Sequence, residues 1–200
     1  MIKELILDIL FPKYCFGCGK EGLYICKECE LFMTDVQHSV LHNLVAFWEY
    51  SGIVKELIHR IKFNGEYDII KELINKKDFE VAENAVITYV PMHIKKQRKR
   101  GFNQAEIIAR ELGRKTGKPV VKLLEKIKET KDQATLDKAA RLENVKNTFR
   151  FCGSPGLPQI SEVLLVDDVY TSGATMQECS KVLRKAGFKN IWGFTLAKTM

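Results

Sequence analysis

The sequence predicts an α/β fold in which helices cover both faces of a parallel sheet. Strand-like and helix-like segments alternate from about residue 44 onward, which is the pattern of βαβ units. The run Val163-Leu-Leu-Val166 is continuously apolar, as expected for a parallel strand that is buried on both faces. The 200 residues, 46% hydrophobic and 28% charged, suffice for one globular domain with a small appendage.

The individual elements follow from residue periodicity. An apolar stripe at helical spacing begins at Ile53 and stops before Asn64-Gly65, a pair that ends helices. A second helix should end at Gly117, two residues before Pro119. We expect strands at 44–50, 85–90, 163–166 and 191–197, and helices at 53–61, 103–116 and 176–186.

The N-terminal segment is marked by four cysteines in the spacing C-x2-C-x7-C-x2-C: Cys15, Cys18, Cys26 and Cys29. Two CxxC pairs supply four thiolates, the donor set of a structural Zn²⁺, and leave no open position for catalysis. Residues 1–43 are too few to build a core of their own, so we expect a zinc-ribbon-like module there and a second unit over 44–200. Unliganded cysteines and a redox dithiol pair are the alternatives. His38 and His42 are also spaced for a metal, but the cysteines already complete one zinc site.

The charge and hydropathy of the chain indicate what kind of partner and which cellular location to expect. A formal net charge of +7 favours a polyanionic or phosphorylated partner. No apolar run is long enough to cross a bilayer. The first residues, Met1 to Asp8, contain acids and do not resemble a secretory signal, so we expect a cytoplasmic protein.

The segment from Val163 to Thr175 carries the candidate chemistry. A buried strand is expected to end at Asp167 and Asp168, at the sheet edge where ligands of parallel sheets bind. Small and hydroxyl residues then lead into a helix N-terminus and form an anion cradle: Thr171, Ser172, Gly173, Ala174 and Thr175. The loop holds no cation to pair with the acids, so they fit a ligand with hydroxyl groups as well as a phosphate, such as a ribose 5-phosphate.

Two stretches carry a family resemblance. VLLVDDVYTSGAT, at 163–175, resembles the 5-phosphoribosyl-1-pyrophosphate (PRPP) signature of type I phosphoribosyltransferases. VPMHIKKQRKRGFNQA, at 90–105, resembles ComF-type competence proteins, as do QATL at 133–136 and RLENV at 141–145. That family joins a four-cysteine zinc module to a phosphoribosyltransferase domain, so the resemblance covers nearly the whole chain. The seven-residue gap between the cysteine pairs is shorter than the common zinc-ribbon spacing, so a ribbon here must be compact.

The resemblance implies roles on the ribose side of the ligand and a fold of the type I phosphoribosyltransferase kind. Asp167 and Asp168 would be the catalytic acids that contact the ribose hydroxyls. The cradle from Thr171 to Thr175 would hold the 5-phosphate.

It also implies roles on the pyrophosphate side. Pro91, Met92 and His93 would form the pyrophosphate loop, and Arg98 and Arg100 would neutralise its charge. Lys131, Gln133 and Arg141 would belong to a hood that closes over the leaving group. Mg²⁺ would accompany PRPP.

Simpler interpretations stand beside these roles. The charged run Lys95–Arg100 could be solvated surface. His93 could be a structural histidine. The position of Lys62 near the end of its helix favours a simple role as a cation that interacts with the helix dipole.

Two functions remain open. An enzyme would transfer the phosphoribosyl group of PRPP to a nitrogenous acceptor with release of pyrophosphate, in a ComF-type role linked to DNA uptake and natural transformation. The alternative is a non-catalytic PRPP or phosphate sensor that binds single-stranded DNA, with Phe102 stacking on bases. Proteins of the recombination or uptake machinery are further candidate partners, and a homodimer is left open.

Overall fold

The computed structural model describes residues 12–36, 43–130, 138–153 and 162–200. Its elements, in chain order, are α2 (Lys27–Glu30), β1 (Leu44–Glu49), α3 (Gly52–Asn64), α4 (Asp68–Asn75), β2 (Ala85–Tyr89), α5 (Ile94–Arg100), α6 (Gln104–Thr116), β3 (Leu124–Lys126), α7 (Lys138–Val145), β4 (Phe149–Phe151), β5 (Glu162–Tyr170), α8 (Ala174–Lys185) and β6 (Asn190–Lys198). Four strands form a parallel sheet in the order β1-β6-β5-β2. The predicted α/β class with a parallel sheet is confirmed.

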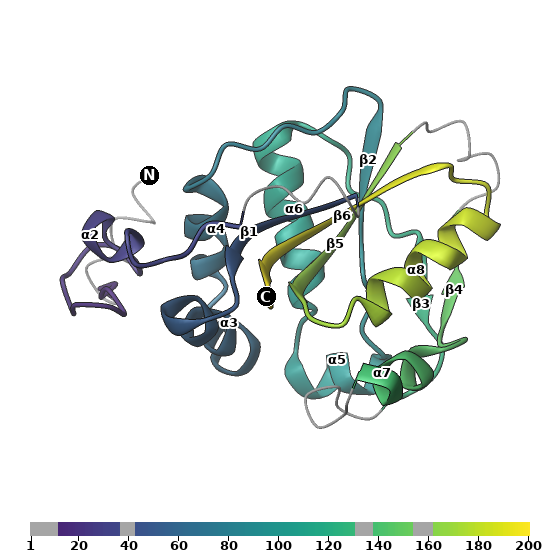
Figure 1. Ribbon diagram of the computed structural model, residues 1–200, viewed down its shortest axis with the longest axis horizontal. Helices are drawn as coiled ribbons and strands as arrows, with labels where there is room; N and C mark the ends of the chain where they lie inside the picture. The colour runs from purple at the N-terminus through teal and green to yellow at the C-terminus, as the bar shows by residue number, and fades with distance from the viewer. Residues whose placement is uncertain (1–11, 37–42, 131–137, 154–161) are drawn as a thin grey trace.

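Helices cover the sheet on both faces, as Figure 1 shows. On one face lie α3, α4 and α6, and α6 packs on β5 and β2. On the other lie α8, α7 and the antiparallel pair β3–β4, with α8 packed on β5. Within the described residues, no helix is both long and apolar enough to span a membrane.

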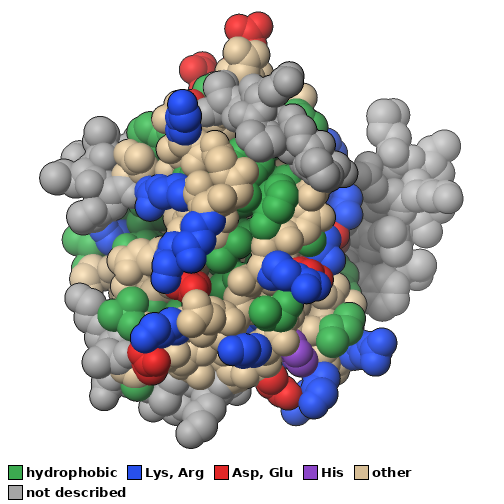
Figure 2. All heavy atoms as spheres, turned by 90° about the vertical axis from the view of Figure 1, so that its right-hand side faces the viewer, with side chains coloured by type: hydrophobic (Ala, Val, Ile, Leu, Met, Phe, Trp, Pro, Cys, Tyr) green, Lys and Arg blue, Asp and Glu red, His purple; other side chains and the backbone are tan. Residues whose placement is uncertain are grey.

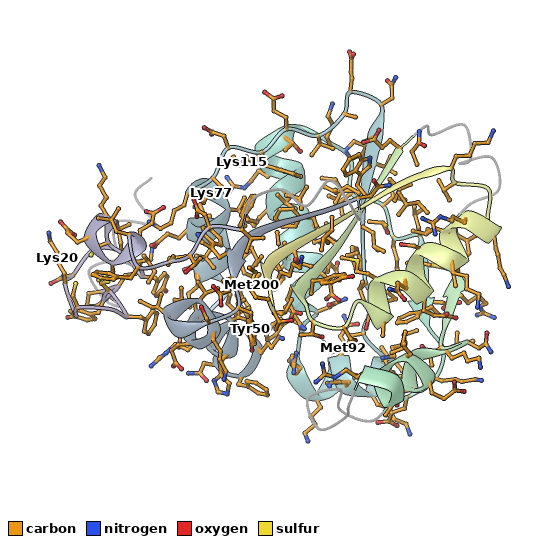
Figure 3. All side chains as sticks on the ribbon, viewed as in Figure 1. Lys20, Tyr50, Lys77, Met92, Lys115 and Met200 are labelled. Atoms are coloured by element: carbon orange, nitrogen blue, oxygen red, sulfur yellow. The ribbon has the colours of Figure 1, made fainter. Side chains whose placement is uncertain are left out.

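The sequence signals account for most of this framework. In α6, Ala105, Ile108 and Leu112 are buried at helical spacing, and Gly117 ends the helix with a left-handed φ of 70°. Lys115, in the last turn of α6, donates to the carbonyl oxygen of Ile74 at 2.9 Å and to that of Lys77 (Figure 3). It thereby fastens α6 to the end of α4, because Ile74 lies in the last turn of α4, where carbonyl groups have no partner within the helix, and Lys77 follows that helix.

The cysteine segment docks against α3 and α4 at the edge of the molecule (Figure 1). Ile25 is fully buried in the same apolar cluster as the sheet. The Arg60 guanidinium of α3 lies 4.3 Å from the ring centroid of Phe16. Glu72 of α4 accepts the backbone N–H groups of Tyr24 and Ile25 at 3.0 and 2.8 Å. These contacts tie the segment to the helices beneath it.

The surface that carries α8 has mixed charge. Figure 2 shows Lys and Arg side chains spread among acidic and hydrophobic ones over the described part of this face. Two of the pairs are Arg150 with Glu125 and Lys181 with Glu178, the latter at 3.7 Å. The positive charge of the chain is therefore partly neutralised here.

Candidate functional site

A cleft of about 1390 Å³ opens at the carboxyl ends of the parallel strands. The ends of β1, β2, β5 and β6 meet at this edge, together with the end of α3, the start of α8 and the helices α5 and α7. Tyr50, just after β1, and Met92, after β2, both line it, and both lie in the lower half of the view in Figure 3. This is the edge at which parallel sheets bind ligands.

Basic side chains outnumber acidic ones around the cleft. The basic ones are Lys55, Lys62, Lys95, Lys96, Lys99, Arg100, Lys126 and Arg141, and the acidic ones are Asp167, Asp168 and Glu129. A cavity with this imbalance and low-dielectric walls attracts anionic ligands.

The anion cradle forms a tight turn between β5 and α8. Thr171, Ser172 and Gly173 connect the two elements, and Ala174 is the first helical residue. Gly173 has a φ of +77°, and a Cβ built on it would lie 2.3 Å from the hydroxyl oxygen of Tyr170. Any other residue would be strained at this φ and would require Tyr170 to move. The first residues of α8, Ala174 to Met176, line the cleft, and the N-terminus of a helix suits an anion.

The strand does not end at the acids, so that expectation is wrong. β5 continues to Tyr170, because Asp167 pairs with Thr195 and Tyr170 with Lys198 on β6. Consecutive strand residues point to opposite faces, so Asp168 lies on the side of α3 and α6 and Asp167 on the side of α8. The acids flank the strand rather than sharing one surface.

Their environments differ accordingly. Asp168 is 7% exposed, and its Oδ2 receives Lys62 Nζ at 2.8 Å and Gln104 Nε2 at 2.9 Å. Burial disfavours the charged form of Asp168, but the Lys62 ammonium and the Gln104 hydrogen bond hold its pKa below the ordinary value. Burial, and then the charge of Asp168, raise the pKa of Asp167 to about 7.

Lys62 lies in the last turn of α3, as expected for a cation near a helix end. Its ammonium also pairs with Asp168, a contact that the sequence did not predict. The loop itself holds no cation to pair with the acids, and α3 supplies one from outside it. Because Lys62 is distant in sequence, its pairing had no local signal.

The pyrophosphate-side residues are split between the cleft and the surface. Pro91, Met92 and His93 follow β2 and line the cleft, as does Arg100. His93 directly precedes α5, and its Nδ1 is buried without a hydrogen-bond partner among the described residues. Arg98 is exposed and is not among the cleft-lining residues. The charged run is the short helix α5, and four of its five cations line the cleft, whereas Arg98 does not.

The hood can be described only in part. Arg141, on α7, lines the cleft, whereas Lys131 and Gln133 lie outside the described residues. Lys126, on β3, lines the cleft and was not singled out from the sequence; its Nζ donates to Thr130 Oγ1 at 2.8 Å. Burial lowers the pKa of Lys126.

The four cysteines form a compact cluster at the other end of the chain. The Sγ atoms of Cys15, Cys18, Cys26 and Cys29 all lie within 4.8 Å of one another, and Cys18 and Cys26 are 3.6 Å apart. A tetrahedron with Zn–S bonds of about 2.3 Å has edges of about 3.8 Å, so the cluster fits zinc, whereas a disulfide needs about 2.05 Å. A Cβ on Gly17 would lie 2.5 Å from Cys29 Sγ, so the first knuckle needs glycine.

The cluster also carries N–H donors suited to thiolates. Cys26 N donates to Cys15 Sγ at 3.4 Å. Burial opposes ionisation of Cys15, but backbone N–H groups of Cys26, Cys18 and Gly17 outweigh it and lower its pKa to about 6. His38 and His42 lie outside the described residues.

Comparisons with known proteins show which family the chain belongs to. No protein-family model matches it. A solved structure of the allosteric regulatory enzyme of purine biosynthesis resembles 63% of this chain and 24% of that one, with a TM-score of 0.37 and 20% identity, a likeness too distant to bear on function. Competence protein ComFC of Bacillus subtilis is 26% identical over 92% of this chain and 78% of its own length. DNA utilization protein YhgH of Escherichia coli O157:H7 is 27% identical over 93% and 89%. Competence protein F of Haemophilus influenzae is 31% identical over 94% of this chain and 86% of its own length. The chain therefore belongs to the ComF-type family of competence protein F.

Proposed function

We propose that this protein is a cytoplasmic phosphoribosyltransferase that binds PRPP with Mg²⁺ in the cleft and transfers the phosphoribosyl group to a nitrogenous acceptor. The observation that carries the proposal is the adjacency of a glycine-dependent anion cradle and a carboxylate pair at one sheet edge. A ligand with a phosphate and neighbouring hydroxyl groups satisfies both. The surrounding lysines and arginines suit its second, pyrophosphate, end.

The reaction is a substitution at the anomeric carbon. The lone pair of the acceptor nitrogen forms a bond to C1, the bond from C1 to the pyrophosphate oxygen breaks, and pyrophosphate leaves with that electron pair. The proton lost by the acceptor passes to water or to the pyrophosphate. The protein contributes positioning and electrostatic stabilisation rather than a nucleophile.

Each side of the site has a distinct task. Backbone N–H groups at Thr171–Thr175 hold the 5-phosphate, and the carboxylate of Asp167 accepts hydrogen bonds from the ribose hydroxyl groups. Met92, His93 and Arg100 face the pyrophosphate, with Arg141 closing over it from α7. Mg²⁺ would arrive on PRPP, whose phosphate oxygens are its preferred hard ligands, and would supply positive charge against the leaving group.

We further propose that residues 1–43 form a zinc module and 44–200 the phosphoribosyltransferase domain. The sulfur geometry supports one structural Zn²⁺ on Cys15, Cys18, Cys26 and Cys29. With four thiolates the ion has no open position, so its contribution is to the folding of the segment.

Release of pyrophosphate tests the enzyme. Wild-type protein with PRPP, Mg²⁺ and a panel of nitrogenous bases should release pyrophosphate with at least one acceptor. Asp167→Asn should weaken PRPP binding roughly 10- to 150-fold in calorimetry, the usual cost of one charged hydrogen bond. Asp78→Asn, an exposed acid outside the cleft, is the matched control. Equal PRPP affinity in the two variants, or no PRPP binding by wild type, would overturn the proposal.

A second candidate function is single-stranded DNA binding in DNA uptake. The relatives are named competence and DNA utilization proteins, and α5 carries Lys95, Lys96, Arg98, Lys99 and Arg100 on one short helix. Such contacts release counterions, so affinity should fall steeply with salt. PRPP binding without turnover, together with DNA binding, would favour a sensor over an enzyme.

Neutralising the five cations of α5 tests that function. If all five contact phosphates, the log–log salt slope of single-strand binding should shrink by about 3.5. Removing Lys146, Arg150, Lys181, Lys185 and Lys189, on the α8 side of the molecule, is a control of equal charge. Equal slopes for the two variants would show that the cations of α5 make no specific contribution to DNA binding.

A further inference from the structure

Asp168 is held by two side chains from two different helices. Lys62, in the last turn of α3, lies 2.8 Å from its Oδ2, and Gln104, in the first turn of α6, donates to the same oxygen at 2.9 Å. The other oxygen, Oδ1, accepts the backbone N–H of Val169 at 2.7 Å. The side chains of Lys62 and Asp168 are only 22% and 10% exposed, so solvent screens the pair weakly.

The Gln104 amide is itself oriented. Arg100 donates from Nη1 to Gln104 Oε1 at 2.9 Å, which leaves Gln104 Nε2 to donate to Asp168. The guanidinium of Arg100 lies 5.3 Å from the ring centroid of Phe63, the neighbour of Lys62. The ends of α3, α5 and α6 thus meet in one network whose centre is Asp168.

Asp167 has a different set of neighbours. Its Oδ1 accepts the backbone N–H of Asp168 at 2.9 Å, and Oδ2 has no hydrogen bond to any described residue. It lines the cleft on the side of α8. The charged and titratable groups around the two acids are Lys62 and Tyr50 on one side, and Lys126 and Cys179 on the other.

We propose that Lys62 is a positioning residue of this site: with Gln104, its ammonium fixes Asp168 as a carboxylate, and it thereby leaves Asp167 as the acid that meets the hydroxyl groups of the ligand. The first half stands on the described contacts alone, and the second half rests on the proposed function.

A physical argument supports this division. Two adjacent carboxylates in a poorly solvated site cannot both ionise without a cation, because burial and mutual repulsion both favour a proton. Lys62 contacts only one of them, so it sets which acid is charged. Without Lys62, Asp168 would be a buried charge next in sequence to a second acid and without a cation, and it would take up the proton instead.

Substituting Lys62 tests the assignment without any ligand. Carboxyl carbon NMR titrations should show Asp168 of wild type ionised throughout pH 5–8, with Asp167 titrating near neutral pH. In Lys62→Met, Asp168 should titrate within that range, whereas Lys62→Arg should keep it ionised. Lys185→Met removes another lysine from the last turn of a helix, α8, and should leave both titrations as in wild type. An unchanged Asp168 titration in Lys62→Met would overturn the proposal.

Ligand binding tests the second half. At pH 7, Lys62→Met should bind PRPP with Mg²⁺ at least 10-fold more weakly than wild type and should recover part of that loss at pH 8.5. Lys62→Arg should stay within about threefold of wild type. A loss that is the same at both pH values would overturn the positioning role. If wild type binds no PRPP, the proposed function fails, while the carboxyl titrations still decide the role of Lys62. Should Lys62→Met not fold, Gln104→Met carries the same test with the same expected direction.

Discussion

Glu72 Oε1 on α4 accepts a hydrogen bond from the backbone N–H of Ile25 at 2.8 Å, one residue before Cys26 of the four-cysteine cluster. Its Oε2 accepts the N–H of Tyr24 at 3.0 Å, so one carboxylate fixes two consecutive peptide groups. The N–H of Cys26 then points at Cys15 Sγ. The second cysteine pair is therefore positioned by a helix of the α/β unit, not by the segment alone.

Glu72→Gln should weaken zinc binding because a neutral amide has one acceptor oxygen in place of two and no charge. Loss of a residue that orients metal ligands typically costs about 10- to 100-fold in metal affinity. Competition with a chromophoric chelator measures the affinity. Glu111→Gln, the same change in α6, should leave it unchanged. Equal zinc affinities in the two variants would mean that the cluster holds its geometry without Glu72.

Cys26→Ser should abolish stoichiometric zinc because a serine hydroxyl is a poor ligand for this ion. Elemental analysis should find one zinc per chain in wild type and in Cys152→Ser, which changes an exposed cysteine outside the cluster. The N-terminal segment should lose its structure while the parallel sheet persists. The helices beneath should lose protection from hydrogen exchange as well, since Ile25 is buried in the common core. Metal-replete wild type without zinc would contradict this prediction.

The sequence predicted the elements whose signals are local. The periodicity of α6, the apolar run of β5 and the glycines after helices depend on neighbouring residues, and those elements were confirmed. The length of β5 was underestimated because Asp167 and Asp168 interrupt its apolar run, and pairing with β6 overrides the low strand propensity of these two acids. The charged run 94–100 gave no apolar stripe, so α5 was not expected as a helix.

The candidate site was predicted where its residues are contiguous. The acid pair and the cradle lie on one stretch, so a resemblance could find them. Lys62, Gln104 and Lys126 come from α3, α6 and β3, and only the folded chain brings them to the cleft. A lysine near a helix end has an ordinary local explanation, which is why its long-range partner Asp168 had no signal.

Gly173→Ala should destabilise the protein more than an ordinary glycine substitution does. A side chain there is strained by the φ of +77°, and its Cβ would collide with the hydroxyl oxygen of Tyr170 at 2.3 Å. Gly117→Ala is the matched control, because its φ is +70° and nothing lies within 4 Å of the built Cβ. We expect a cost of about 1 kcal/mol for Gly117→Ala and about 2–3 kcal/mol for Gly173→Ala in denaturant unfolding. A Gly173 variant with a bulky side chain therefore reports on folding as well as on phosphate binding. Equal costs would mean that Tyr170 moves aside freely.

Asp167→Asn should stabilise the ligand-free protein at alkaline pH. The pKa of Asp167 is raised from 3.8 to about 7, first by burial and then by the charge of Asp168, so the folded state binds this proton more tightly than the unfolded state does. Stability is therefore lost as pH rises from about 4 to about 7, and the loss is complete above that. An asparagine does not ionise and does not incur the loss. Relative to wild type, the variant should gain roughly 2 kcal/mol in unfolding free energy between pH 5 and pH 8.

Asp168→Asn should do the opposite, because the pKa of Asp168 is lowered and Lys62 would be left without its partner. Urea unfolding at the two pH values separates the outcomes, and a wild-type-like pH dependence in Asp167→Asn would show that another group binds the proton. If the gain is found together with weakened PRPP binding, the acid is kept at a cost in stability because the ligand needs it.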